Sequence, residues 1–128
     1  MSFCTAINCM DGRTQLPVNE YLRNKLGVDY VDTITEPGPA RLLAEEPDSA
    51  STESIVSRVD ISVKKHGSQN VAVVGHYDCT GNPAAEDKQK QQLDLAVRFL
   101  AARYPGVRIA GLWVDSAGSV EEFCTAMV

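Results

Sequence analysis

The sequence predicts an α/β fold, a three-layer domain with a mostly parallel, four-stranded β-sheet and helices on both faces. Segments of strand length alternate with segments of helical periodicity along the chain, an order typical of parallel sheets covered by helices. One strand segment, 71–75, is an unbroken apolar run, typical of a strand buried on both faces. With 128 residues, 44% of them hydrophobic, the chain is long enough for one domain, residues 1–128, to bury its own core.

The first part of the chain predicts a strand, a helix and a second strand. Residues 3–8 are short and apolar enough for a buried strand, and the loop 11–13 follows. Pro17 suits the first turn of a helix because it has no N–H to donate, and Gly27 stands where that helix would stop. The second strand is expected at 30–35.

The middle of the chain contains one ambiguous element. Residues 36–39 (Glu-Pro-Gly-Pro) predict a loop, 40–46 a short helix and 47–52 a polar connection. In the segment that then runs to about His66, apolar residues recur at alternate positions, as in a strand, and also at every fourth position, as on a helix face. We predict a helix there, because the next segment is itself a buried strand.

The last part predicts one long helix and a final strand. After the strand at 71–75, apolar residues recur at steps of three and one over 93–104, the clearest amphipathic pattern in the chain. Pro105 and Gly106 end this helix. The last predicted strand is 107–114, and the tail beyond it shows no clear pattern.

Two loops of this predicted sheet hold residues that could bind a metal ion. Ligands of such sheets sit outside the carboxyl ends of the strands, where the strand order reverses, and Cys9, His76 and Cys79 follow the first and third strands. Catalytic zinc sites typically have three protein ligands and leave a fourth position for water, whose pKa then falls to near 7. Asp11 could hydrogen-bond that water or displace it and ligate zinc itself, and Arg13 could hold the Asp11 carboxylate by a bidentate pair.

These motifs resemble those of the β-class carbonic anhydrases. The stretch 9–13, Cys-Met-Asp-Gly-Arg, is similar to the family's Cys-x-Asp-x-Arg after the first strand, and 76–79, His-Tyr-Asp-Cys, to its His-x-x-Cys after the third. The stretch 109–115, with Gly-Ser-Val at 118–120, resembles the family's last strand and turn. The resemblance therefore covers nearly the whole chain.

The resemblance implies a zinc enzyme that hydrates carbon dioxide reversibly to bicarbonate by zinc-bound hydroxide. Cys9, His76 and Cys79 would be the zinc ligands, and Asp11 with Arg13 the catalytic pair that orients the hydroxide. A related small electrophile such as carbonyl sulfide belongs to the same substrate class. The resemblance also implies a homo-oligomer, most simply a homodimer.

The chain departs from the family pattern at three places. The loop after the second strand usually reads Ile-Arg-Asn-Ala-Gly, whereas 34–38 is Ile-Thr-Glu-Pro-Gly, so we expect Glu36 to place a carboxylate near the position of an anionic product and to repel it. Thr80 separates His-x-x-Cys from the glycine that usually follows it, and we expect a reshaped pocket. Cys9 is the ninth residue, so we expect no N-terminal arm of the kind that wraps a partner subunit.

Two other function classes are alternatives to a zinc enzyme that hydrates carbon dioxide. A zinc-binding protein without catalysis, with a structural, regulatory or assembly role, is the alternative that stays open. A thiol enzyme is excluded because no cysteine has an arginine six positions later, as a phosphatase loop needs, and no Cys-x-x-Cys is present.

The charge and the N-terminal sequence predict the partners and the location. The net charge is -5 and no basic cluster is present, which argues against nucleic acid and anionic membranes as partners. The first residues contain neither a basic start nor an apolar export segment, so we expect a cytoplasmic protein whose thiols stay reduced.

Four further residues have only partial interpretations. Cys4 would be a buried small hydrophobe and Cys124 lies in the tail. His66, next to a helix end, would be solvated, with a role as proton shuttle as the alternative. Tyr77 could shield the metal ion.

Overall fold

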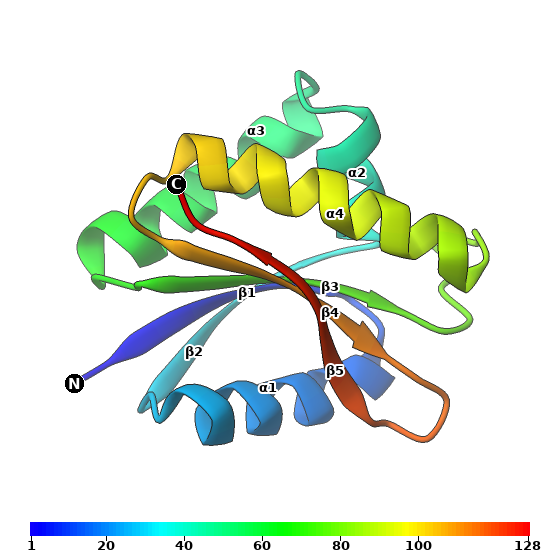
Figure 1. Ribbon diagram of the computed structural model, residues 1–128, viewed down its shortest axis with the longest axis horizontal. Helices are drawn as coiled ribbons and strands as arrows, with labels where there is room; N and C mark the ends of the chain where they lie inside the picture. The colour runs from blue at the N-terminus through cyan, green and yellow to red at the C-terminus, as the bar shows by residue number, and fades with distance from the viewer.

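A five-stranded β-sheet runs through the centre of the molecule, with helices on both of its faces (Figure 1). The computed structural model describes residues 1–128. Its elements, in chain order, are β1 (Phe3–Cys9), α1 (Gly12–Leu26), β2 (Tyr30–Glu36), α2 (Pro39–Glu45), α3 (Ala50–Asp60), the π-helical turn η1 (Ile61–Lys65), β3 (Asn70–His76), α4 (Glu86–Arg103), β4 (Arg108–Val114) and β5 (Val120–Ala126). The predicted fold class is confirmed.

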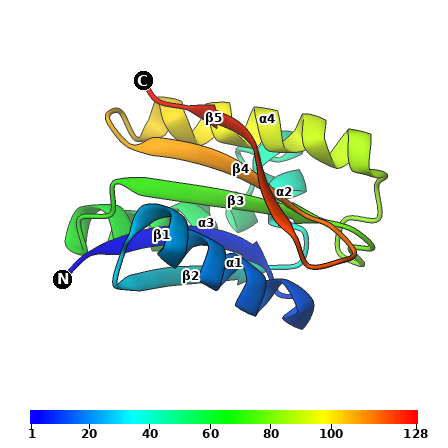
Figure 2. The same cartoon turned by 60° about the horizontal axis from the view of Figure 1, so that its bottom comes forward.

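The two faces of the sheet are covered unequally. Helix α1 alone packs on one face, and α2, α3 and α4 cover the other (Figures 1 and 2). The core between the sheet and α2 to α4 has 17 buried residues and the core under α1 has nine, so most of the apolar burial that stabilises the fold lies on the three-helix side. None of the helices combines the length and the apolar composition needed to cross a lipid bilayer.

The strand order places the candidate site. The order is β2-β1-β3-β4-β5, and β1 pairs in parallel with both β2 and β3. From β1 the chain first adds β2 on one side, and it then crosses to the other side of β1 to add β3, β4 and β5. The strand order therefore reverses between β1 and β3. Their carboxyl ends meet at one edge, where such folds bind ligands.

The fifth strand is a correction to the predicted sheet of four. β5 pairs antiparallel with β4, after a turn in which the Asp115 carboxylate accepts hydrogen bonds from the N–H groups of Ala117 and Ser119, at 2.9 and 3.0 Å. As an edge strand that is only half covered, β5 has no continuous apolar run to reveal it. The Asp115 turn, with Gly118 at a φ of 80°, is the signal that could have predicted the hairpin.

Helix α1 begins earlier than Pro17 predicts. The Asp11 side chain caps it at Gly12 by accepting the N–H of Arg13 at 2.9 Å, and Pro17 lies inside the helix. A carboxylate cap satisfies an N–H that the first turn leaves free, so the cap determines where the helix starts. The ambiguous segment that ends near His66 is helical, as predicted, over α3 and η1.

Candidate metal centre

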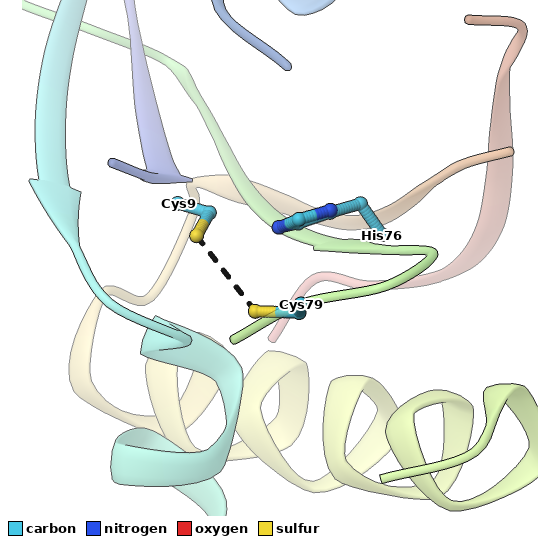
Figure 3. Close-up of side chains that lie close together, drawn as sticks. All are labelled: Cys9, His76 and Cys79. Atoms are coloured by element: carbon cyan, nitrogen blue, oxygen red, sulfur yellow. Dashed lines mark hydrogen bonds between the residues drawn. The ribbon is translucent and has the colours of Figure 1, made fainter. Parts of the chain in front are cut away.

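Three side chains of metal-ligand type converge where β1 and β3 end (Figure 3). Cys9 is the last residue of β1, His76 is the last residue of β3, and Cys79 lies on the turn that follows. Their possible ligand atoms all lie within 4.8 Å of one another, and the two Sγ atoms are 3.8 Å apart. The three residues are 3%, 1% and 4% exposed, respectively, so the surrounding side chains restrict the movement of all three.

The ring of His76 is oriented by the backbone of the same turn. Its Nδ1 lies 2.7 Å from the carbonyl oxygen of Tyr77, which can only accept, so Nδ1 carries a proton. The His76 Nε2 is buried and has no hydrogen-bond partner, and a buried polar atom left unpaired costs about 1–3 kcal/mol. In the neutral ring this Nε2 presents a lone pair to the two sulfur atoms, which is the tautomer that a metal ion requires.

The electrostatics of the cluster favour a cation. Burial raises the pKa of Cys9. The interaction of Cys9 with His76 and with nearby backbone N–H groups lowers it by more, to about 7. Burial, and then the neighbouring Cys9, raise the pKa of Cys79 to about 11. Two buried thiolates side by side repel each other, so both can be ionised together only when a positive ion lies between them. The donor set and the unpaired Nε2 together fit a zinc ion.

Two loops supply backbone N–H groups to the sulfur atoms. The N–H of Gly38 lowers the pKa of Cys9, and those of Asn82 and Gly81 lower that of Cys79. The loops touch backbone to backbone, because a Cβ on Gly38 would lie 2.7 Å from the Asn82 Cβ and 2.9 Å from the Gly81 carbonyl carbon. No side chain fits there. Sequence reasoning missed Gly38 and Gly81 as residues that shape the site.

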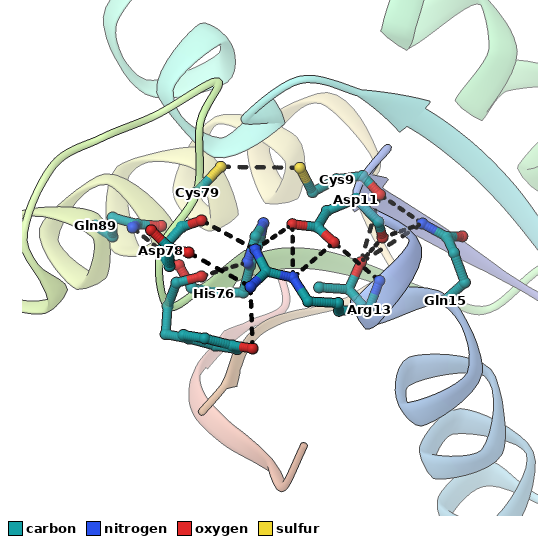
Figure 4. A network of polar contacts seen from close by, with 10 residues as sticks. Cys9, Asp11, Arg13, Gln15, His76, Asp78, Cys79 and Gln89 are labelled. Atoms are coloured by element: carbon teal, nitrogen blue, oxygen red, sulfur yellow. Dashed lines mark hydrogen bonds and ion pairs between the residues drawn. The ribbon is translucent and has the colours of Figure 1, made fainter. Parts of the chain in front are cut away.

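Asp11 and Arg13 form a bidentate pair beside the cluster (Figure 4). The Arg13 Nη2 is 2.6 Å from Asp11 Oδ2 and its Nε is 3.1 Å from Oδ1. These hydrogen bonds and the N-cap bond hold the pKa of Asp11 at about 2 and raise that of Arg13. The Asp11 carboxylate is therefore ionised, and it is not one of the groups in the ligand cluster. The structure thus brings all five predicted site residues together.

An open cleft of about 460 Å³ leads to the cluster. Its lining residues are Cys9, Met10, Asp11, Gly12, Pro37, Thr80 and Gly81. No lysine, arginine or histidine is among them. Pro37 and Thr80, both at places where the sequence departs from the family pattern, form part of the wall.

Glu36 does not lie where the sequence analysis expected it. Its carboxylate forms an ion pair with Arg58 of α3 and does not line the cleft. The expectation that Glu36 repels an anionic product is therefore wrong. Its partner lies 22 positions away in the chain, and no local pattern indicates such a pair.

His66 and the two remaining cysteines lie outside the cluster. His66 stacks on Phe3, at the start of β1, with ring centroids 4.2 Å apart, so it is at the opposite end of the strands and is not placed to shuttle protons. Cys4 is fully buried under α1, as predicted, and burial raises its pKa to about 11. Cys124 is half-buried on β5, against Gly111.

The fold and this cluster define a protein of the β-carbonic anhydrase type. A family model described as "Putative carbonic anhydrase" matches residues 1–124. The chain therefore belongs to the β-carbonic anhydrase family. No match was found among curated protein sequences.

Solved structures of the same fold come from distant relatives. A tetrameric β-carbonic anhydrase from the filamentous ascomycete Sordaria macrospora superposes with a TM-score of 0.65 at 13% identity, over 96% of this chain and 81% of the other. β-Carbonic anhydrase isoform I from the protozoan Trichomonas vaginalis gives 0.62 at 18% identity, over 94% and 81%. A carbon disulfide hydrolase gives 0.54 at 12% identity, over 93% and 77%. At these identities the likeness concerns the fold.

Proposed function

We propose that this protein is a zinc-dependent lyase that hydrates carbon dioxide reversibly to bicarbonate, with residues 1–128 acting as one zinc-binding domain. The observation that carries the proposal is the unpaired, buried Nε2 of His76, which faces two buried thiols, one of which, that of Cys9, belongs to a residue that lines an open cleft. Structural zinc sites usually have four protein ligands, whereas catalytic ones have three. Three are present here.

Cys9, His76 and Cys79 are the proposed zinc ligands. A zinc ion bound there would supply a nucleophile at neutral pH by lowering the pKa of water to about 7. The chain contributes neutral His76, fixed by its hydrogen bond to the Tyr77 carbonyl, and two thiols that ionise as the ion binds. The loops that meet at Gly38 approach each other too closely for any side chain, and they hold the sulfur atoms in place.

Asp11 is the proposed residue that orients water in the cleft. Its carboxylate stays ionised because Arg13 donates to both of its oxygens, so it can accept a hydrogen bond from water over the whole neutral range. The same hydrogen bonds keep Asp11 out of the ligand cluster. This arrangement supports the open, catalytic form of the site over the form in which Asp11 ligates zinc.

The cleft favours a small neutral substrate. Its wall has apolar parts from Met10 and Pro37 and no free cation to attract an anion. Carbon dioxide fits these properties. Carbonyl sulfide and carbon disulfide are small neutral molecules of the same class, and one structural neighbour is named as a carbon disulfide hydrolase. In the hydration of carbon dioxide, water adds to the carbon and one proton leaves to solvent as bicarbonate forms.

We also propose that the protein is a homo-oligomer, with a dimer as the smallest assembly. Met10 on the cleft and Leu16 on α1 are 63% and 65% exposed, and a partner subunit packed against this part of the surface would bury them. The relative from Sordaria macrospora is described as tetrameric.

Zinc analysis combined with stopped-flow hydration of carbon dioxide tests the function. We expect one zinc ion per chain and measurable hydration in the unmodified protein, loss of both in Cys79→Ser, and retention of both in the matched control Cys124→Ser. Protein purified without chelators that contains no zinc contradicts the whole proposal. Full zinc occupancy without hydration from about pH 6 to about pH 9 contradicts the catalytic part and favours the structural, regulatory or assembly alternative.

A further inference from the structure

The guanidinium of Arg13 is held from two directions. One is local, because Asp11 is two residues away. The other comes from the turn after β3, where Arg13 Nη1 donates to the Tyr77 hydroxyl at 3.1 Å and Nη2 donates to the Asp78 carbonyl at 3.1 Å. The Arg13 Cζ lies 4.8 Å from the centre of the Tyr77 ring, within the range of a cation–π contact. Figure 4 shows Arg13 between Asp11 and Asp78.

The turn has an unusual shape that suits this contact. Asp78 has a φ of 49°, the only residue other than glycine in the left-handed region, which aspartate tolerates better than most residues. The Tyr77 N–H donates to Val114 on β4 at 3.1 Å, which fixes the turn to the sheet. The Tyr77 carbonyl accepts from His76. One residue, Tyr77, therefore contacts both a proposed metal ligand and the arginine that holds Asp11.

The contact from the turn matters because the local pair alone is weak. The Arg13 side chain is 47% exposed, and exposed ion pairs contribute little because water and side-chain entropy compete with them. A second set of contacts, to a part of the chain 64 and 65 positions away, removes that freedom. It also directs Nε and Nη2 toward the Asp11 oxygens.

We infer that Tyr77 is a positioning residue, which locks Arg13 so that Asp11 is held away from the metal ion and a position stays open to an external ligand. The inference rests on the proposed function, because it concerns the metal ion of that site. Without the Tyr77 contacts, Arg13 keeps from this turn only the Asp78 carbonyl, at 3.1 Å, and the exposed Asp78 carboxylate, at 3.4 Å, so its hold on Asp11 is weaker. The Asp11 carboxylate, released from it, can then bind the metal ion, since carboxylates are common zinc ligands.

Iodide binding to the Co²⁺-loaded protein tests the inference without measuring activity. Iodide enters an open position on the ion and changes the visible spectrum of Co²⁺, so a titration yields its apparent Kd. Tyr77→Ala loses both the ring and the hydroxyl group. We expect it to raise this Kd about tenfold, because residues that orient a metal site typically contribute at least that factor. Tyr77→Phe keeps the ring and loses one hydrogen bond, so we expect about a threefold rise.

The double variant Tyr77→Ala with Asp11→Asn separates positioning from general damage to the site. An amide is a poor zinc ligand, so we expect the double variant to bind iodide within about twofold of the unmodified protein. Unchanged iodide binding in Tyr77→Ala, or a double variant as weak as Tyr77→Ala, overturns the inference while the metal site stands. An unmodified protein that binds no Co²⁺ overturns the proposed function and the inference with it.

Discussion

Each end of the central strands has a histidine beside a buried polar cluster, and the two differ in how far their polar atoms are satisfied. At the amino end, His66 Nδ1 lies 2.6 Å from Asp32 Oδ2, and the same oxygen accepts from the Ser62 hydroxyl at 2.6 Å. At the carboxyl end, His76 Nε2 has no partner. The His66 Nδ1 therefore has its partner within the protein, whereas the His76 Nε2 is left for the metal ion that we propose.

The backbone is also packed more tightly at the carboxyl end than at the amino end. At the amino end, Gly67 has open space around its Cβ position, although its φ is 71°. At the carboxyl end, a Cβ on Gly81 would lie 2.6 Å from the Pro37 carbonyl carbon. The amino end is a local network that holds two segments together, and the carboxyl end is a tightly built pocket. The carboxyl end is therefore where we place the proposed metal ion.

The largest expected effect comes from replacing the two histidines in turn. We expect His76→Gln to lower zinc affinity by more than about a hundredfold, since even residues that only orient a ligand cost about 10–100-fold. His66→Gln, the matched control, should leave zinc affinity unchanged. Competition with a chromophoric chelator measures both. Equal zinc affinities in the two variants would remove the distinction between the ends of the sheet.

The second prediction concerns the glycines. Gly81→Ala forces the two loops apart, so we expect a loss of about 1–3 kcal/mol in the free energy of unfolding together with weaker zinc binding. Gly67→Ala meets no neighbour and has only backbone strain, about 1–2 kcal/mol, with no change in zinc binding. Urea denaturation and zinc titration of the two variants test this contrast. Unchanged zinc affinity in Gly81→Ala argues against a role for the loop contact in the site.

The third prediction tests whether the amino end is purely structural. The Ser62 hydroxyl is buried and shares hydrogen bonds with Thr5, Asp32 and Ser68, at 2.6, 2.6 and 2.8 Å. We expect Ser62→Ala to lower the free energy of unfolding by about 1–3 kcal/mol, because it leaves buried partners unpaired. Zinc content should stay at the level of the unmodified protein. A loss of zinc in Ser62→Ala would show that the two ends are coupled.

The smallest expected effect is on the pH dependence of stability. The pKa of Asp11 falls from 3.8 to about 2 on folding, chiefly through the hydrogen bonds from Arg13. A lowered carboxyl pKa stabilises the fold above the unfolded pKa, and this stabilisation is lost as the pH falls through the folded one. We therefore expect the metal-free Asp11→Asn protein to be slightly less stable than the unmodified protein at pH 7, with the difference disappearing between about pH 4 and about pH 2. Thermal unfolding at several pH values measures it, and a constant difference would contradict the assigned pairing.

The sequence predicted the parts of the fold that depend on local patterns. Apolar runs marked β1 and β3, and the spacing of His76 and Cys79 on one turn placed two proposed ligands together. Cys9 could be added because parallel strands end at a common edge. These are short-range signals combined with one rule of topology.

The remaining features depend on contacts between distant segments. The edge strand β5 is recognisable only once β4 is beside it. The Glu36 pair with Arg58 and the Tyr77 contact with Arg13 join residues 22 and 64 positions apart. The close approach of Gly38 to Gly81 requires two loops to meet in space. Periodicity in one segment contains no information about such pairings.

X-ray absorption at the zinc edge tests the central claim most directly, namely that Cys9, His76 and Cys79 bind one metal ion. We predict two sulfur ligands at about 2.3 Å and two nitrogen or oxygen ligands at about 2.0–2.1 Å in the unmodified protein, and one sulfur fewer in Cys79→Ser if any zinc remains. A shell of sulfur alone, a shell without sulfur, or an unmodified protein that holds no zinc would contradict the claim.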